Sequence, residues 1–97
     1  MSNIDWSQLI TKAAKDAAIA AQMLAEHTVR EGAWRVAELL VVARQLEAIE
    51  ESEADETPPD LLPGTRKQWL KYRGLVSNWN DGAEQFPSLD HRPARPV

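Results

Sequence analysis

Apolar residues recur along residues 11–51 at the spacing of one face of an α-helix. Steps of three and four connect a stripe of apolar and small residues: Val29, Gly32, Ala33, Val36, Leu39, Val42, Ala43, Leu46 and Ile49. Such a stripe needs a second surface that buries it. The segment contains no proline, and it is rich in alanine, leucine, glutamate, glutamine and arginine, which are good helix formers. We therefore predict a helical region over about residues 10–51.

Two features vary along this region. Leu40 and Val41 widen the stripe until more than half of the circumference is apolar, whereas the alanine-rich residues 13–27 carry a narrower face with Ile19, Met23 and Leu24. The narrower face suits a close approach of another helix. At the start of the region three residues fit an N-cap equally well: Asp5, Ser7 and Thr11.

The length of the helical region leaves two alternatives open. A straight helix of about forty residues extends roughly 60 Å, whereas a compact domain of this size has a radius of gyration of about 13 Å. The helix can break or kink near Gly32, since glycine costs about 1 kcal/mol relative to alanine in a helix, and the domain then has three helices. Alternatively the helix is continuous and packs against another copy in a coiled-coil-like oligomer.

An acidic segment follows the helical region. Residues 50–60, EESEADETPPD, lack apolar periodicity, carry a run of like charges and contain a Pro-Pro pair that ends a helix. We predict a solvated acidic and proline-containing linker over residues 52–64.

A second, shorter helix is predicted over residues 65–81. Thr65 and Gln68 have the spacing of a capping box, and Asn80-Asp81-Gly82 is typical of a helix end with Gly82 as the C-cap. Steps of three, four and three place the large side chains on one side of this helix: Trp69, Tyr72, Val76 and Trp79. Gly74 lies inside the helix, so we expect a neighbouring backbone or ring close to it.

The last residues, 83–97, are rich in proline and hold too few apolar side chains for a core of their own. We predict an extended tail, in which Phe86-Pro87 folds back onto the aromatic helix and residues 92–96, RPARP, are polyproline-like. The fold class that follows is all-α, with a single small helical domain.

Charge separates the two parts of the chain. Residues 1–64 hold twelve acids and five bases, and residues 65–97 hold six bases and three acids, within a net charge of −4. The parts attract each other or other copies, and the acidic balance argues against nucleic acid as a partner. No cysteine, leader or membrane-length apolar segment occurs, so we expect a soluble cytoplasmic protein without a membrane partner.

Candidate catalytic groups are sparse. His27 and His91, the two histidines, show no ligand or triad spacing, and phosphate-binding and nucleophile motifs do not occur. We expect no enzymatic activity, no cofactor and no metal site. The aromatic helix has two interpretations: its rings form the core, or part of this face together with Phe86 docks a partner, since tryptophan, tyrosine and arginine dominate binding hot spots.

Several short motifs in the second half resemble a family of small proteins from tailed bacteriophages. WRVAEL at 34–39, LPGTRKQWLKYRGLVSNW at 62–79, FP at 86–87 and RPARP at 92–96 are similar, in order and spacing, to the tail assembly chaperones, or tail fibre assembly proteins. The similarity covers about residues 33–96. Val76 beside Leu75 departs from the family pattern, and residues 11–31 have no fixed counterpart in it.

This resemblance implies a non-enzymatic protein of the bacterial host cytoplasm that binds and shields a phage tail or tail fibre component during virion morphogenesis. The residues expected to bind the partner are Trp34, Arg35, Trp69, Tyr72, Arg73, Trp79, Phe86 and Pro87. Two other functions remain open at this point: a structural component of the tail or baseplate, and a small inhibitor of a host protein. Self-association is also left open.

Overall fold

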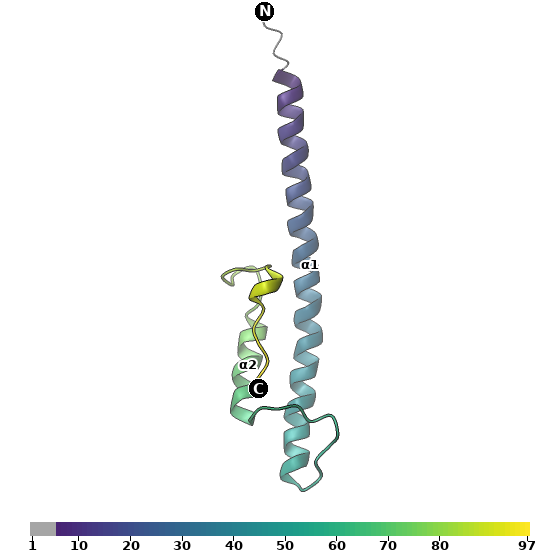
Figure 1. Cartoon of the computed structure of the whole chain (residues 1–97), viewed down its shortest axis with the longest axis vertical. Helices are drawn as coiled ribbons and strands as arrows, with labels where there is room; N and C mark the ends of the chain where they lie inside the picture. Colours follow the sequence, from purple (N-terminus) through teal and green to yellow (C-terminus); the bar gives the residue numbers. More distant parts are fainter. Residues whose placement is uncertain (1–5) are drawn as a thin grey trace, which may run out of the picture.

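The computed structural model describes residues 6–97, and the side chains from residue 11 onward. It contains helix α1 (Trp6–Glu53), helix α2 (Arg66–Ser77) and a short 3₁₀ helix η1 (Leu89–His91), and the described residues form no strand (Figure 1). The predicted all-α class is therefore confirmed. The molecule measures 85 × 19 × 17 Å with a radius of gyration of 21.8 Å, well above the ~13 Å of a compact domain of this length.

Helix α1 runs unbroken through Gly32, so the kinked alternative is wrong. A Cβ added at Gly32 would meet nothing within 4 Å, and no neighbouring element bends the helix there. The helix also starts earlier and ends later than the predicted range 10–51. Ser7 and Thr11 therefore lie within it and do not cap it, while Asp5 falls outside the described residues.

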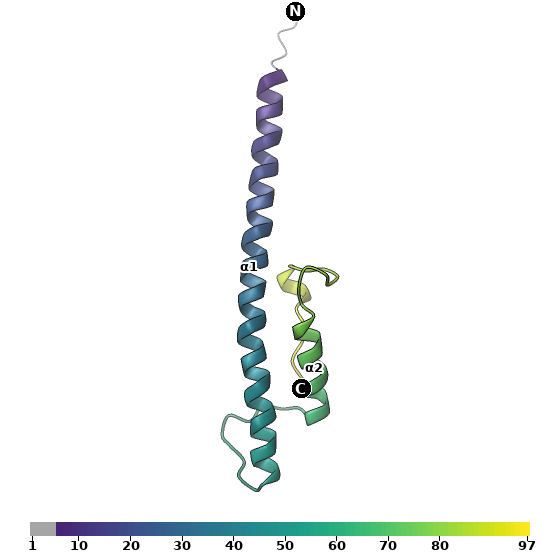
Figure 2. The same cartoon turned by 180° about the vertical axis from the view of Figure 1, so that it is seen from behind.

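The chain then reverses direction to form a helical hairpin. Helix α2 packs against the second half of α1, and the tail runs back beside both helices, as Figures 1 and 2 show from opposite sides. We call this part, residues 30–97, the head. The first half of α1 extends beyond it, and every side chain from residue 11 to residue 27 is exposed. We call residues 11–27 the arm.

The acidic linker is shorter than predicted and is anchored at its end. Helix α1 continues to Glu53, so the linker begins two residues later than expected. Its residues 54–57 are exposed, as the charge run indicated. Asp60, however, accepts two hydrogen bonds from the Arg44 guanidinium at 2.7 and 2.9 Å, and Arg66 of α2 pairs with Glu53 at 3.0 Å. These charge pairs tie both ends of the linker to the hairpin.

Helix α2 begins as predicted and ends earlier. The Thr65 hydroxyl accepts from the Gln68 amide at 3.2 Å, and the Gln68 side chain accepts from the Thr65 amide at 2.8 Å, which confirms the capping box. The helix ends at Ser77 because the Asn78 side chain donates to the carbonyl of Gly74 at 2.9 Å, so Gly82 is not its C-cap. No neighbour lies within 4 Å of a Cβ added at Gly74, contrary to the close approach that we expected.

The core lies between the two helices. Val42, Trp69, Tyr72 and Val76 are buried together, and the side chains packed around them are Trp34, Leu39, Leu46, Ile49 and Leu62. The predicted pairing of the two apolar stripes is confirmed for these residues.

The other part of the predicted α1 stripe is exposed. Val29, Ala33, Val36 and Ala43 all face solvent, and so does Leu40, at 69% exposure. The prediction merged two apolar strips that lie on different sides of the helix. Three polar residues lie at the centre of the face of α1 that contacts α2.

Gly64 sits at the tight junction between the linker, α2 and the tail. Its φ of +123° lies in a region that favours glycine, and a Cβ there would come within 2.7 Å of both Pro96 Cβ and Trp69 Nε1. Only glycine lets the chain enter α2 while the tail end covers the Trp69 indole.

Candidate functional site

Three buried polar residues form a row along the face of α1 that meets α2 and the tail. Glu31, Glu38 and Gln45 follow one another at intervals of seven residues, and their exposed fractions are 0%, 5% and 3%. Seven residues are close to two helical turns, so the three side chains point the same way. Buried charges are costly unless they are paired, so each member of this polar row needs a partner from elsewhere in the chain.

Glu31 holds the turn that follows α2 and the start of the tail. Its carboxylate accepts two hydrogen bonds from the Arg92 guanidinium, both at 2.6 Å, one from Trp79 Nε1 at 3.0 Å and one from Arg30 Nε at 2.7 Å. The hydrogen bonds from Arg92, and then those from Arg30 and Trp79, lower the pKa of Glu31 to about 2 against the opposing effect of burial. The group is therefore an anion wherever the head is folded at neutral pH.

Glu38 holds the end of the tail against α2. Its carboxylate accepts from Arg95 Nε at 2.5 Å, from Arg95 Nη2 at 3.0 Å and from the Tyr72 hydroxyl at 2.7 Å. The Arg95 hydrogen bonds lower the pKa of Glu38, although burial works in the other direction. Burial, followed by the neighbouring Glu38, raises the pKa of Tyr72, so the phenol stays protonated and donates.

Gln45 fixes the linker where it enters α2. Its amide nitrogen donates to the Asp60 carbonyl at 3.0 Å, and its amide oxygen accepts from the Leu62 amide at 2.7 Å. The polar row thus fastens the tail at two points and the linker at one point to the same face of α1.

Lowering the pH should loosen the head. Because the pKa values of Glu31 and Glu38 are lower in the folded state than their ordinary value of 4.5, their contribution is complete above that pH. It is lost as the pH falls through their folded values, about 2 for Glu31. We expect the melting temperature of the head to be constant near neutral pH and to decrease when the pH is lowered below 4.5. Thermal unfolding monitored by near-UV circular dichroism measures this. Glu31→Gln with Glu38→Gln should flatten this dependence; an unchanged slope would contradict it.

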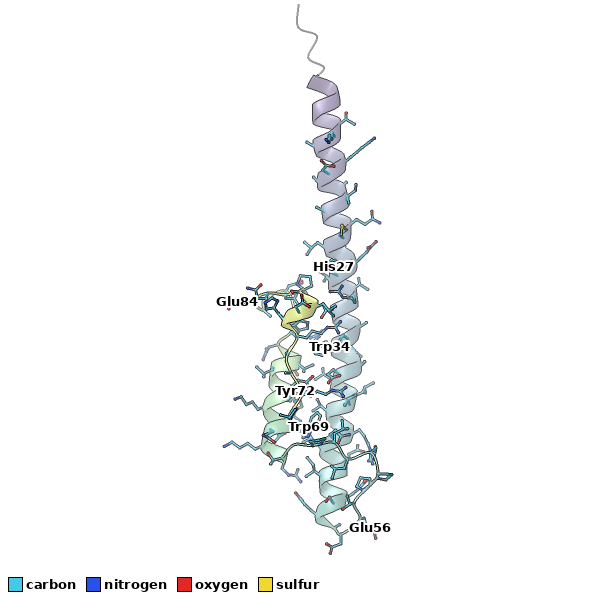
Figure 3. The ribbon with its side chains drawn as sticks, viewed as in Figure 1. His27, Trp34, Glu56, Trp69, Tyr72 and Glu84 are labelled. Carbon is cyan, nitrogen blue, oxygen red and sulfur yellow. The ribbon has the colours of Figure 1, made fainter. Side chains whose placement is uncertain are left out.

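Aromatic rings cover the ion pairs. The Arg92 guanidinium lies 4.8 Å from the centre of the Trp34 ring, a cation–π contact. Phe86 folds back onto Trp79, which follows the end of α2, and the two rings meet edge to face at 5.2 Å. Trp69 and Tyr72 of α2 meet in the same way at 5.7 Å. Figure 3 shows Trp34, Tyr72 and Trp69 following one another along the head between α1 and α2.

Most of the residues expected to bind a partner are brought together, but by contacts within the chain. Trp69, Tyr72 and Trp79 are 0%, 2% and 4% exposed, so the core interpretation of these rings is confirmed. Arg35 donates to the Ser77 carbonyl at 3.3 Å, and the Pro87 carbonyl accepts from Arg30 at 3.1 Å. Arg73 is exposed and takes no part in the network described here. Binding of a partner by these residues stays a prediction.

The polar row and the two arginines that pair with it were not predicted from the sequence, although a signal was present. Glu31 and Glu38 are separated by about 10.5 Å along a helix, and Arg92 and Arg95 by about 9.3 Å in a polyproline-like segment. The two spacings match when the tail runs parallel to α1, as it does here. Matched charges of opposite sign could therefore have suggested this pairing.

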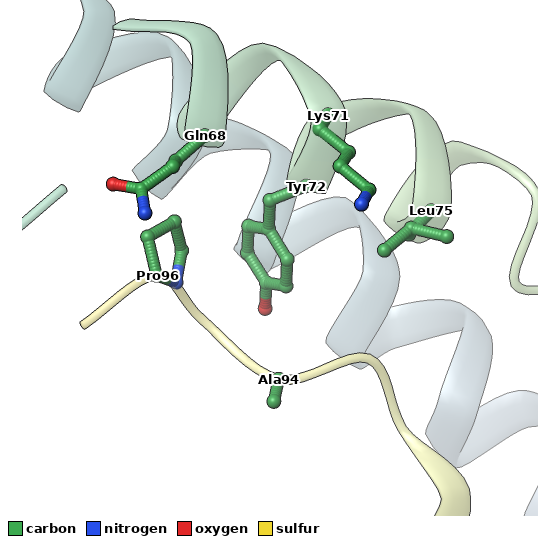
Figure 4. Close-up of a pocket in the computed structure, with 6 residues that line it drawn as sticks. All are labelled: Gln68, Lys71, Tyr72, Leu75, Ala94 and Pro96. Carbon is green, nitrogen blue, oxygen red and sulfur yellow. The ribbon is translucent and has the colours of Figure 1, made fainter. Parts of the chain in front are cut away.

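A shallow cavity opens where the tail passes α2. It has a volume of about 230 Å³, and its lining residues are Gln68, Lys71, Tyr72, Leu75, Ala94 and Pro96. In Figure 4, Tyr72 points from α2 toward the tail, with Pro96 and Ala94 on the far side. The cavity is a gap between α2 and the tail.

A second accessible feature is the apolar surface of the arm. Ile19, Met23 and Leu24 are 56%, 50% and 56% exposed. At about 100° per residue, Met23 and Leu24 lie on the side of α1 that faces α2 further down the helix, and Ile19 lies next to Met23, about 100° from the direction of Glu38. We call these three residues the arm patch. It begins next to His27, which lies just beyond the head in Figure 3.

Comparisons with protein families, curated proteins and solved structures find no match to this chain. Across the described residues, no group of histidine, aspartate and glutamate is arranged to hold a metal ion. No helix in residues 6–97 is both long and apolar enough to cross a membrane.

Proposed function

We propose that the protein is a non-enzymatic assembly chaperone for a phage tail or tail fibre component, acting in the cytoplasm of the bacterial host. Two kinds of support favour this proposal. The first is the resemblance of residues 34–39 and 62–96 to the tail assembly chaperones. The second is that residues of these motifs lock into one unit, in which Arg92 contacts Trp34 and Glu31, and Arg95 and Tyr72 meet on Glu38.

One observation supports the assignment of a binding surface: the arm is a helix whose large apolar side chains are not covered by any other described residue. Apolar residues spaced along one side of a helix are a common means of entering a groove on a partner protein. Met23 is flexible and adapts to irregular apolar surfaces. We assign the arm patch as the surface that shields the partner, while the head provides the rigid base that holds the arm.

Co-expression with the tail and fibre genes of the same phage tests this function. We expect one tail or fibre protein to co-purify with the wild-type chain and to gain solubility. Ile19→Glu with Met23→Glu should abolish that capture, because charges replace the apolar contact. Leu75→Glu on α2, a residue 51% exposed and remote from the arm, is the matched control and should retain it. Absence of any tail or fibre protein in the wild-type purification would overturn the proposal.

The rod-like shape favours a second candidate, a structural component of the tail or baseplate. A chain 85 Å long is well suited to permanent packing along a larger assembly. Mass spectrometry of purified virions separates the two functions, since a chaperone is absent from mature particles and a structural component is present at a fixed copy number.

A further inference from the structure

A second apolar strip lies on the side of α1 that faces away from α2. It consists of eight residues at steps of three and four, all of them exposed: Ala18, Gln22, Ala25, Val29, Ala33, Val36, Leu40 and Ala43. At about 100° per residue, these residues lie within about 40° of the direction opposite Glu38. We call this strip the back face. Its three largest apolar members, Val29, Val36 and Leu40, are 73%, 58% and 69% exposed.

The large apolar side chains of the back face are left in water, where they do not stabilise α1 by burial. Val29 is a β-branched residue with weak helix propensity, and Gly32 at the edge of the strip costs about 1 kcal/mol relative to alanine. Nothing in the described chain lies within 4 Å of a Cβ added at Gly32. Most helical stability in proteins comes from packing of an apolar face, and α1 lacks such packing on this side.

We propose that the back face binds the back face of a second copy of this chain, with the two α1 helices antiparallel. Residue numbers of facing positions then add up to 61 or 62, and the two-fold axis passes close to Gly32. Each of the following pairs occurs twice in the dimer: Ala18 with Ala43, Gln22 with Leu40, Ala25 with Val36, and Val29 with Ala33. The inference goes beyond the proposed function, because it concerns a different surface and a different partner.

Side-chain volume favours this orientation. In the antiparallel register each large side chain of the central layers faces a smaller or more flexible one: Leu40 faces Gln22, Val36 faces Ala25 and Val29 faces Ala33. The layers therefore have similar widths, and the helices can approach evenly along about 38 Å. A parallel register would stack Leu40 on Leu40 and Ala33 on Ala33, which alternates wide and narrow layers.

Charge favours the same orientation. Lys15 lies in line with the back face at one end and Glu47 at the other, and the antiparallel register brings Lys15 of one copy to Glu47 of the other. A parallel register would instead place Lys15 beside Lys15 and Glu47 beside Glu47. Exposed pairs contribute little stability, but pairs that flank an apolar seam determine helix orientation.

The dimer leaves the arm patch accessible. The back face points away from α2, whereas Met23 and Leu24 are on the α2 side of the helix, so antiparallel pairing covers one and spares the other. The two heads lie toward opposite ends of the rod, and each arm runs behind the head of the other copy. Met23 and Leu24 of both copies therefore remain accessible, and Ile19 lies at the edge of the seam.

Mass in solution tests the interface. By sedimentation equilibrium, we expect the wild-type chain to reach the mass of a dimer as its concentration rises. Leu40→Glu should shift it to the monomer over the same range, because two charges enter the apolar seam. Leu24→Glu is the matched control: it is a leucine of similar exposure on the other side of α1, and its variant should dimerise like the wild type. A wild-type monomer at every concentration overturns the proposal, and so does dissociation by Leu24→Glu.

Single cysteines test the orientation, since the chain has none of its own. A mixture of Ala18→Cys and Ala43→Cys chains should form the mixed disulfide on mild oxidation. Ala18→Cys alone should stay unlinked, because its two sulfurs would be separated by about 38 Å along the antiparallel rod. A disulfide in Ala18→Cys alone would overturn the antiparallel arrangement. Capture of a tail protein in the absence of dimerisation, or dimerisation without capture, separates this inference from the proposed function.

Discussion

Trp69→Ala is expected to destabilise the head by about 3–5 kcal/mol, the range for removing a large buried side chain from a core. The indole has 0% exposure and belongs to the buried cluster with Val42 and Val76. It also donates to the Pro63 carbonyl at 3.2 Å and meets Tyr72 edge to face. Truncation leaves a cavity, an unpaired carbonyl and a loose linker at the same time. Small domains have only about 5–15 kcal/mol to lose, so this substitution would remove a large part of the stability of the head.

Chemical unfolding followed by the fluorescence of Trp34 and Trp79 measures this effect, because both rings sit in the head. Leu70→Ala is the control: it is the next residue of α2 and is 40% exposed, so its variant should unfold within about 1 kcal/mol of the wild type. A Trp69→Ala variant with wild-type stability that loses a tail protein would instead assign the indole to a partner interface.

Local chemistry explains which parts of the fold the sequence predicts. The α2 start depends on Thr65 and Gln68, which lie three residues apart, and the aromatic face depends on helical spacing within ten residues. The start was predicted correctly, and so was the shared face of Trp69, Tyr72 and Val76, whereas Trp79 lies beyond the end of the helix. The end of α2 was not predicted correctly, because the Asn78 side chain satisfies the Gly74 carbonyl before Gly82 is reached. Asn78 and Gly82 can each end a helix, and Asn78 ends α2 because it comes first along the chain.

Continuity through Gly32 was left open for a different reason. One glycine costs about 1 kcal/mol, which is too little to break a helix when no packing contact stabilises the broken form. The expectation of a compact shape assumed that the chain buries all its apolar stripes within itself. The structure leaves one of them, including Val36 and Leu40, on the surface.

The polar row was missed because it depends on contacts between distant residues. Glu31 and Arg92 are 61 positions apart, and Glu38 and Arg95 are 57 apart. Glutamates within a helical pattern usually lie on its solvated side. The buried face was therefore assigned to the apolar positions, and the glutamates were not expected to belong to it. Charge asymmetry between the two parts predicted an attraction, and these two pairs and the pair of Arg66 with Glu53 show it. The register was encoded only in the matching spacing of the charges.

Glu31→Ala is expected to cost about 3 kcal/mol or more of head stability, since breaking a buried pair leaves an uncompensated charge. Its removal deprives Arg92, Trp79 and Arg30 of their acceptor at once. The Arg92 side chain keeps 23% exposure, so partial hydration places the effect near the lower end of the 3–5 kcal/mol range. Glu26→Ala, in the exposed arm of the same helix, is the control and should change stability by no more than about 0.5 kcal/mol.

A double-mutant cycle distinguishes the pair itself from the general cost of burying charge. Glu31→Leu combined with Arg92→Met replaces both charges with apolar side chains, and we expect it to cost less than Glu31→Leu alone, because no lone guanidinium remains against Trp34. The measurement is chemical unfolding of the wild type, both single variants and the double variant. Strictly additive losses of unfolding free energy would mean that Glu31 and Arg92 act independently. That result would contradict the role of this ion pair as the contact that holds the tail against α1, which we call the latch. A large positive coupling, together with tail residues that become protease-sensitive in the Glu31 single variant, would establish that the latch holds the tail in place.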